Sequence, residues 1–196
     1  MRFHFGEIPS SPDFVPDASW RSLRQAPSPR LENLLALPIG IVAAVTVAAL
    51  WFLLTPLRDI KPAMSLPAFL LLFAGFVVVH EGIHALVHPM AGLSQHSILG
   101  IGPSSVYANY DAELSRNRLV AILLMPLLII TIVPLLVSAV TQVSSGWVAF
   151  VSAFNALCAC ADMLLAGQLL FQVPATAIVR FKSWKIYWRE HDTLAA

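Results

Sequence analysis

The chain has 196 residues, of which 58% are hydrophobic and only 12% are charged, and its formal net charge is +1. Ordinary soluble domains are about 45–50% apolar and about 25% charged, so this composition excludes an ordinary soluble domain. A net charge so close to zero also argues against nucleic acid as a partner. Cys158 and Cys160 stand too close together for an ordinary disulfide.

The first 32 residues are rich in Pro and Ser and contain no apolar core. We therefore expect residues 1–32 to be a soluble N-terminal lead-in and not a cleavable signal peptide. The first apolar stretch after them, at about residues 33–54, then acts as the insertion signal.

Four apolar stretches are long enough for a helix to cross about 30 Å of hydrocarbon. Pro126 and Pro134 interrupt the third of them, so a kinked or locally loosened helix is expected there. The predicted fold is an all-α membrane protein with four transmembrane helices inside a domain of residues 33–175. The stretches cover approximately residues 33–54, 66–88, 119–140 and 146–171.

The second stretch contains the sequence His80-Glu81-Gly82-Ile83-His84. Positions four apart lie on one face of a helix, so His80 and His84 can place two imidazole nitrogens on one zinc ion. Glu81 flanks that ion, where a carboxylate can accept a proton from an activated water. The alternative is a polar cluster packed among helices. His and Glu are costly in hydrocarbon unless something binds or pairs with them.

The loop that follows the motif contains two extended runs, Ser94–Ile101 and Ser105–Tyr110, joined through Gly102 and Pro103. This pattern predicts a short β-hairpin-like loop between the second and third helices. An exposed strand edge beside the histidines could hold a peptide in extended form by strand addition. An ordinary structured loop that covers the helix ends is the alternative.

The fourth stretch holds Asp162, which is the only carboxylate besides Glu81 in the four stretches, and they contain no Lys or Arg. A shared divalent cation is the natural partner for such acids. With His80 and His84, Asp162 would supply three protein ligands and leave one position for water, as in catalytic zinc sites. An interhelical polar contact is the alternative for Asp162.

Asn155 lies seven residues before Asp162 and thus on the same predicted helical face. Its amide could bind the substrate backbone or a developing oxyanion, which makes it a candidate substrate-binding residue. A plain hydrogen bond between helices is an equal alternative.

Residues 176–196 form a predicted cytoplasmic juxtamembrane tail in which basic and aromatic residues alternate. Ten of the basic residues lie in the N-terminal segment, the middle loop and this tail, whereas the first loop has only Arg58 and Lys61. The positive-inside rule therefore predicts that both termini are cytoplasmic.

The motif at 80–84, the segment Tyr107–Arg118 and the Asn155…Asp162 helix that ends at Pro174 resemble the zincin peptidase family of small multi-pass prokaryotic membrane proteins. More distantly, the chain is similar to site-2 protease intramembrane metalloproteases. That resemblance implies His80 and His84 as zinc ligands, Glu81 as catalytic base, Asp162 as third ligand and a prokaryotic cell membrane as location. Ala161 and Met163 flank Asp162 where site-2 proteases place Pro and Gly, so their substrate handling is not carried over.

These observations predict a zinc-dependent intramembrane endopeptidase of the HExxH type, with Zn²⁺ as cofactor. Its expected partners are the lipid bilayer and a membrane-embedded or membrane-proximal polypeptide substrate. The alternatives are a non-catalytic membrane scaffold and a protein that binds or transports a divalent metal.

Overall fold

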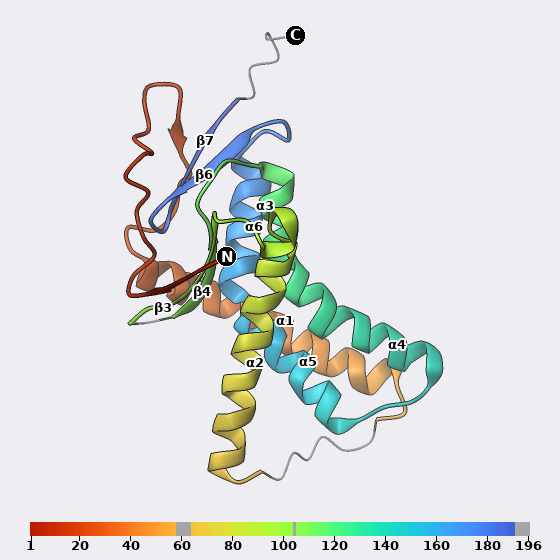
Figure 1. Ribbon diagram of the computed structural model, residues 1–196. Helices are drawn as coiled ribbons and strands as arrows, with labels where there is room; N and C mark the ends of the chain where they lie inside the picture. The colour runs from red at the N-terminus through yellow and green to blue at the C-terminus, as the bar shows by residue number, and fades with distance from the viewer. Residues whose placement is uncertain (58–63, 104, 191–196) are drawn as a thin grey trace.

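The computed structural model describes residues 1–57, 64–103 and 105–190, so that Arg58 and Lys61 of the orientation argument lie outside the described residues. Helices account for most of the described chain, and short strands form two sheets at one end of them (Figure 1). The helical segments are α1 (Pro29–Leu54), α2 (Leu66–Val87), η1 (Pro89–Gly92), α3 (Arg116–Pro126), η2 (Leu127–Ile132), α4 (Val133–Thr141), α5 (Gly146–Cys158) and α6 (Cys160–Gln172).

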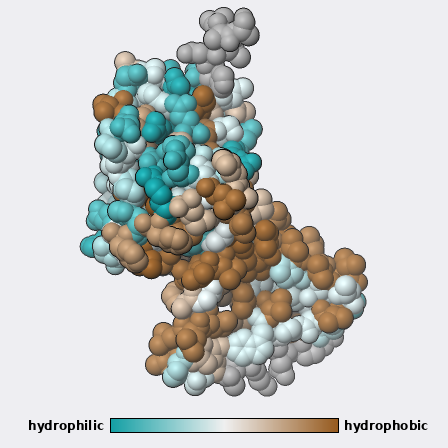
Figure 2. All heavy atoms as spheres, viewed as in Figure 1, coloured by the Kyte–Doolittle hydropathy of each residue, from teal (hydrophilic) through white to brown (hydrophobic). Residues whose placement is uncertain are grey.

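Among the described residues, three helical segments are long and apolar enough to cross a membrane, at residues 29–54, 66–87 and 116–141. The pair α5 and α6 makes a fourth if the two count as one span, but they are bent by 51° at their junction. Figure 2 shows hydrophobic side chains gathered over the helices and hydrophilic ones over the end that carries the sheets. This distribution is compatible with a membrane protein, and insertion itself stays a prediction.

The loosened helix expected around Pro126 is confirmed. Pro126 ends α3, and a π turn, η2, follows it before α4 begins. In the π turn the N–H of Val133 bonds the carbonyl of Leu128, five residues back. The fourth stretch, in contrast, was expected as one straight helix, and Ala159 breaks it into α5 and α6.

The prediction of an all-α fold with one hairpin-like loop holds only in part, because the described chain is mostly helical but its strands form two sheets that also take in the N-terminal segment and the tail. One sheet has the order β1-β3-β4, in which β3 pairs antiparallel with β4 and parallel with the N-terminal β1. The other has the order β2-β7-β6-β5. The strands are β1 (Arg2–Phe5), β2 (Arg21–Ser22), β3 (Ser97–Ile101), β4 (Val106–Tyr110), β5 (Leu114–Ser115), β6 (Ile178–Lys182) and β7 (Lys185–Arg189).

Alternation of apolar and polar residues predicts a strand, but it does not predict which strand pairs with it. Here the pairing strands include N-terminal segments (β1 and β2) and the tail (β6 and β7). The second sheet packs on the helices through a buried apolar cluster that includes Leu114, Leu169, Val179 and Ile186. Burial of such side chains stabilises the contact by roughly 1.5–3 kcal/mol each. The second sheet is therefore firmly attached to α3 and α6. The division into residues 1–32, 33–175 and 176–196 stays a prediction.

Helix α1 crosses the junction between α5 and α6 at Gly40. A Cβ atom added at Gly40 would lie 2.6 Å from the carbonyl oxygen of Leu157 and 2.7 Å from the Cβ of Cys160. Backbone cannot yield as the end of a flexible side chain can, so only glycine fits this close approach. The contact holds α1 against the turn that leads to Asp162.

We expect Gly40→Ala to lower the free energy of unfolding by roughly 1–3 kcal/mol, because the added methyl group overpacks the crossing. Thermal unfolding of the purified protein in detergent micelles measures this change. The matched control is Gly75→Ala in α2, where an added Cβ meets nothing within 4 Å. Gly75→Ala should be neutral or stabilising by about 0.5–1 kcal/mol, and equal destabilisation by both variants would contradict the crossing argument.

Candidate metal centre

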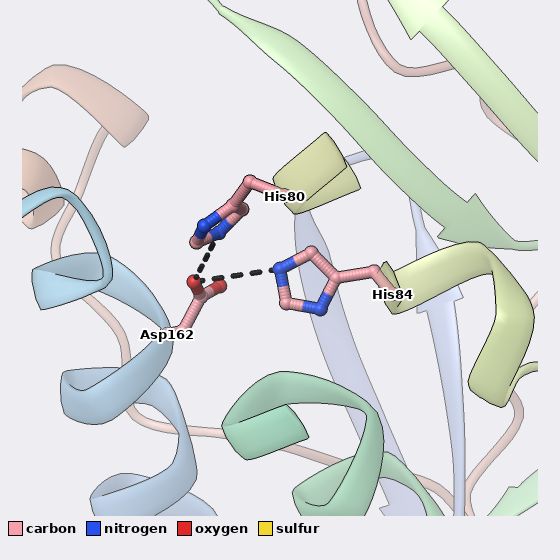
Figure 3. A group of neighbouring side chains, drawn as sticks. All are labelled: His80, His84 and Asp162. Carbon is pink, nitrogen blue, oxygen red and sulfur yellow. Dashed lines mark hydrogen bonds and ion pairs between the residues drawn. The ribbon is translucent and has the colours of Figure 1, made fainter. Parts of the chain in front are cut away.

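Helix α2 places His80 and His84 one turn apart on its buried face, and α6 brings Asp162 opposite them (Figure 3). The Nε2 atom of His80 lies 3.3 Å from the Oδ2 atom of Asp162, and the Nε2 atom of His84 lies 3.5 Å from the same oxygen. The structure thus brings together the three residues that the sequence singled out as metal ligands.

The hydrogen-bond partner of Nδ1 determines which ring nitrogen of His84 carries the hydrogen. The Nδ1 atom of His84 lies 2.8 Å from the carbonyl oxygen of Ile122, inside helix α3. A carbonyl oxygen only accepts hydrogen bonds, so Nδ1 must carry a hydrogen and donate. In the neutral ring, the lone pair is then on Nε2, which faces Asp162.

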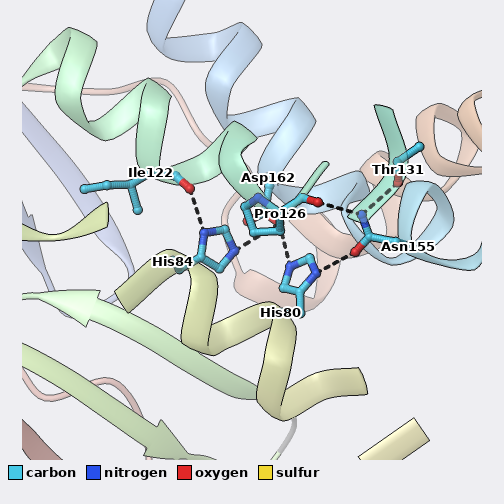
Figure 4. Close-up of polar contacts among 7 residues, drawn as sticks. All are labelled: His80, His84, Ile122, Pro126, Thr131, Asn155 and Asp162. Atoms are coloured by element: carbon cyan, nitrogen blue, oxygen red, sulfur yellow. Dashed lines mark hydrogen bonds and ion pairs between the residues drawn. The ribbon is translucent and has the colours of Figure 1, made fainter. Parts of the chain in front are cut away.

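His80 is held in the same way by Asn155 (Figure 4). The amide nitrogen of Asn155 donates to the carbonyl oxygen of Pro126 at 3.0 Å and to the Oγ1 atom of Thr131 at 2.9 Å. Its Oδ1 atom therefore faces the Nδ1 atom of His80, at 2.9 Å, and accepts a hydrogen bond from it. Nε2 of the neutral His80 ring again presents a lone pair to Asp162.

In the neutral rings, the Nε2 atoms of His80 and His84 are hydrogen-bond acceptors, and both face a carboxylate oxygen of Asp162, which is also an acceptor. Two imidazole lone pairs and a carboxylate oxygen converge, and the three ligand atoms all lie within 4.8 Å of one another. Such a cluster is repulsive unless a metal ion lies between its members or one ring takes up a second proton and donates it to Asp162. In tetrahedral zinc sites with bonds of 2.0–2.2 Å, neighbouring ligand atoms lie about 3.3 Å apart, which agrees with the two distances to Asp162. The donor set and its spacing fit a zinc ion.

Glu81 lies next to these ligands, and it lines the same cavity of about 560 Å³. The carboxylate of Glu81 lies near the backbone N–H of Ala108 in β4. This places the acid between the ligand cluster and the first sheet. The cavity is lined by α2, the β4 segment and the α5–α6 junction, with His80, Glu81, His84, residues 105–110, Cys158, Cys160, Ala161 and Asp162 among its walls.

Strand β4 is the edge strand of its sheet, and its free edge faces this cavity. The N–H of Asp111 bonds the carbonyl of His96, which fixes the alternation along the antiparallel pair. Tyr107 and Asn109 therefore bond β3, whereas the backbone groups of Val106 and Ala108 point away from it. Within the described residues, the cavity wall thus offers backbone donors and acceptors that β3 does not use.

Asn155 differs in position from the other predicted site residues. Its side chain is fully buried, and all its amide hydrogen bonds go to protein groups. The substrate-binding role remains untested, while the geometry favours orientation of His80. The partner groups on Ile122 and Pro126 were missed by sequence reasoning, because a backbone carbonyl leaves no mark in the residue type. The one available signal was Pro126 itself.

His88 caps the C-terminal end of α2 and also borders the cavity. Its ring is almost fully buried against Tyr110, with the ring centroids 5.4 Å apart. Burial lowers the pKa of His88 from 6.5 to about 4, and the nearby charges of His84 and Arg118 lower it further within that shift. His88 is therefore neutral near pH 7, which suits a packing role at the cavity wall.

The model of one protein family, described as Putative zincin peptidase, matches residues 73–178. The matched stretch contains His80, Glu81, His84 and Asp162. No curated protein and no solved structure matches the chain.

A neutral buried His88 makes stability depend on pH. The unfolded chain binds a proton as the pH falls below about 6.5, whereas the folded protein resists protonation until about pH 4. Stability should therefore be lost across this window, by up to roughly 3 kcal/mol. We expect the melting temperature of His88→Phe to fall less than that of the wild type between pH 7 and pH 4.5. Both proteins are measured in chelator, so that His80 and His84 contribute equally. Parallel curves would refute the buried neutral histidine.

Proposed function

The chain belongs to the zincin peptidase family, whose model covers more than half of its 196 residues, and from this premise we propose that it is a zinc-dependent intramembrane endopeptidase. The observation that carries the proposal is the convergence of His80, His84 and Asp162 on one point of a cavity that Glu81 also lines. Family membership supports a metallopeptidase, and the ligand set supports zinc.

In this proposal His80, His84 and Asp162 hold Zn²⁺, and Glu81 is the general base. The bound ion supplies Lewis acidity, which lowers the pKa of water and polarises a peptide carbonyl. Glu81 accepts a proton from the attacking water and returns it to the amine that leaves. The carboxylate of Glu81 lies near the backbone N–H of Ala108, and both residues line the cavity.

The polypeptide substrate is proposed to bind in extended form along the free edge of β4. The outward backbone groups of Val106 and the outward carbonyl of Ala108 would pair with it by strand addition. A peptide bond in an intact helix is shielded by its own hydrogen bonds, so a membrane-embedded or membrane-proximal substrate must unwind before it reaches Glu81. The edge strand gives the unwound backbone new partners, which replaces the helical hydrogen bonds.

The membrane setting of the proposal rests on the apolar helices, three or four of which could span a bilayer. We keep both cytoplasmic termini, a multi-pass location in a prokaryotic cell membrane and the distant likeness to site-2 proteases as parts of the proposal. β2 pairs with β7, so the N-terminal segment and the tail lie together at one end of the helices. That arrangement agrees with termini on one side. A transporter would favour polar groups spread over the bilayer depth, whereas these cluster around one cavity.

We expect Glu81→Gln to slow proteolysis by about 10²–10⁴-fold, because the amide cannot accept the proton. The assay incubates proteoliposomes of the purified protein with an unstructured peptide mixture and identifies new peptide termini by mass spectrometry. Glu81→Gln should bind zinc as the wild type does. The control Glu7→Gln changes an exposed carboxylate in the N-terminal segment and should cleave normally. Undiminished cleavage by Glu81→Gln would remove the proposed base.

Metal content separates the enzyme from a scaffold. The purified wild type should retain zinc, and His84→Ala and Asp162→Ala should each bind it far more weakly, by more than the roughly 10–100-fold that loss of an outer contact costs. Zinc is measured by elemental analysis and by competition with a chelator. Asp13→Ala, which removes an exposed carboxylate, is the control. A wild type without affinity for zinc would favour the scaffold.

A further inference from the structure

We propose that Pro126 is the positioning residue of the metal centre and that it sets the orientation of both histidines. The nitrogen of Pro126 leaves one helix carbonyl free for His84, and the carbonyl of Pro126 holds the asparagine that orients His80. The inference rests on the proposed function only in that the two histidines bind the ion.

The first half concerns His84. In an α-helix, each N–H bonds the carbonyl four residues earlier. The carbonyl of Ile122 would thus belong to residue 126, but proline has no N–H. Ile122 is left with an unpaired carbonyl inside α3, at the depth of the ligand cluster. The Nδ1–H of His84 donates to this oxygen at 2.8 Å. Pro126 therefore creates the acceptor that holds His84.

The second half concerns His80. Just after Pro126 the backbone leaves α-helical geometry and enters the π turn of Leu127–Ile132. The carbonyl oxygen of Pro126 accepts a hydrogen bond from the amide nitrogen of Asn155 at 3.0 Å. Because that nitrogen faces Pro126, the amide oxygen faces His80. A π turn within a long helix often marks a functional site, and here its position explains how one residue reaches both rings.

A chain of buried hydrogen bonds prevents Asn155 from turning over. Thr131, in the π turn, donates from Oγ1 to the carbonyl of Ser152 at 2.9 Å, so that its oxygen must accept from Asn155. Ser152 donates from Oγ to the carbonyl of Thr131 at 3.1 Å and accepts from the indole N–H of Trp51 at 3.1 Å. Side chains of all four residues are fully buried. A reversed amide would place its oxygen against the carbonyl oxygen of Pro126 and the Oγ1 atom of Thr131, acceptor against acceptor, which is costly where water cannot compensate.

The two halves have one chemical result. Both rings keep their hydrogen on Nδ1 and present Nε2 toward Asp162. Histidine ligands of metals commonly depend on such a partner for their tautomer and direction. In Pro126→Ala, the new backbone N–H would point at the carbonyl of Ile122 and compete with His84 for it. A loss of zinc affinity should follow without removal of any ligand.

The test measures zinc affinity of the purified full-length protein in detergent by competition with a chelator, together with the visible spectrum of the Co²⁺-loaded protein. We expect Pro126→Ala and Asn155→Leu to bind Zn²⁺ about 10–100-fold more weakly and to change the Co²⁺ spectrum. The matched control is Pro134→Ala, a proline in the same span that lies in the first turn of α4. It should keep the wild-type affinity and spectrum.

Each result decides the matter. Wild-type affinity in Pro126→Ala, or an equal loss in Pro134→Ala, would overturn the inference, and wild-type affinity in Asn155→Leu would overturn its His80 half. Melting curves identify a variant that has not folded, and ¹⁵N NMR of the metal-free wild type then decides instead. His80 and His84 should carry a hydrogen on Nδ1, and a hydrogen on Nε2 alone would overturn the proposal. A wild type that binds no zinc contradicts the proposed function, whereas zinc binding that ignores Pro126 contradicts this inference alone.

Discussion

The geometry around Asp162 depends on one electrostatic constraint. Lone pairs of two imidazoles and a carboxylate meet at a point between apolar helices, and they repel one another unless a positive charge joins them. In water such groups would separate and be solvated, but α2 and α6 hold them in place. The fold therefore maintains an arrangement that needs a positive charge, from a metal ion or from a second proton on an imidazole, and three such ligands can hold a metal ion tightly.

A ligand cluster alone does not select a substrate. In the proposed function, the sheets supply the surface that binds it. The first sheet lies against α2 and presents its edge strand β4 to the cavity beside Glu81. The apolar cluster beneath the second sheet ties β6 and β7 to α3 and α6. The candidate ligands, Glu81 and strand β4 therefore lie on elements that pack against one another. In the proposed function, a displacement of either sheet would therefore disturb the metal site, and a displacement of the ligands would disturb the sheets.

Much of the centre could be predicted from the sequence, since its signals are local. The spacing of His80 and His84 and the isolated charge of Asp162 in an apolar stretch each follow from one-dimensional patterns. The strands at the termini could not be found in this way, because their pairing joins residues far apart in the chain. The bend at Ala159 was missed as well, since no proline or glycine marks it. A main-chain oxygen directs His84, and another helps to hold the asparagine that directs His80, and any residue type supplies such oxygens.

Strand β7 is among the last segments of the described chain, yet it lies in the middle of its sheet, between β2 and β6. β2 and β6 therefore stay unpaired on their facing edges until β7 has been synthesised and has left the ribosome. Contacts between such distant segments form slowly and late. Under the proposed function, the peptidase would lack its completed second sheet until that point of its own synthesis.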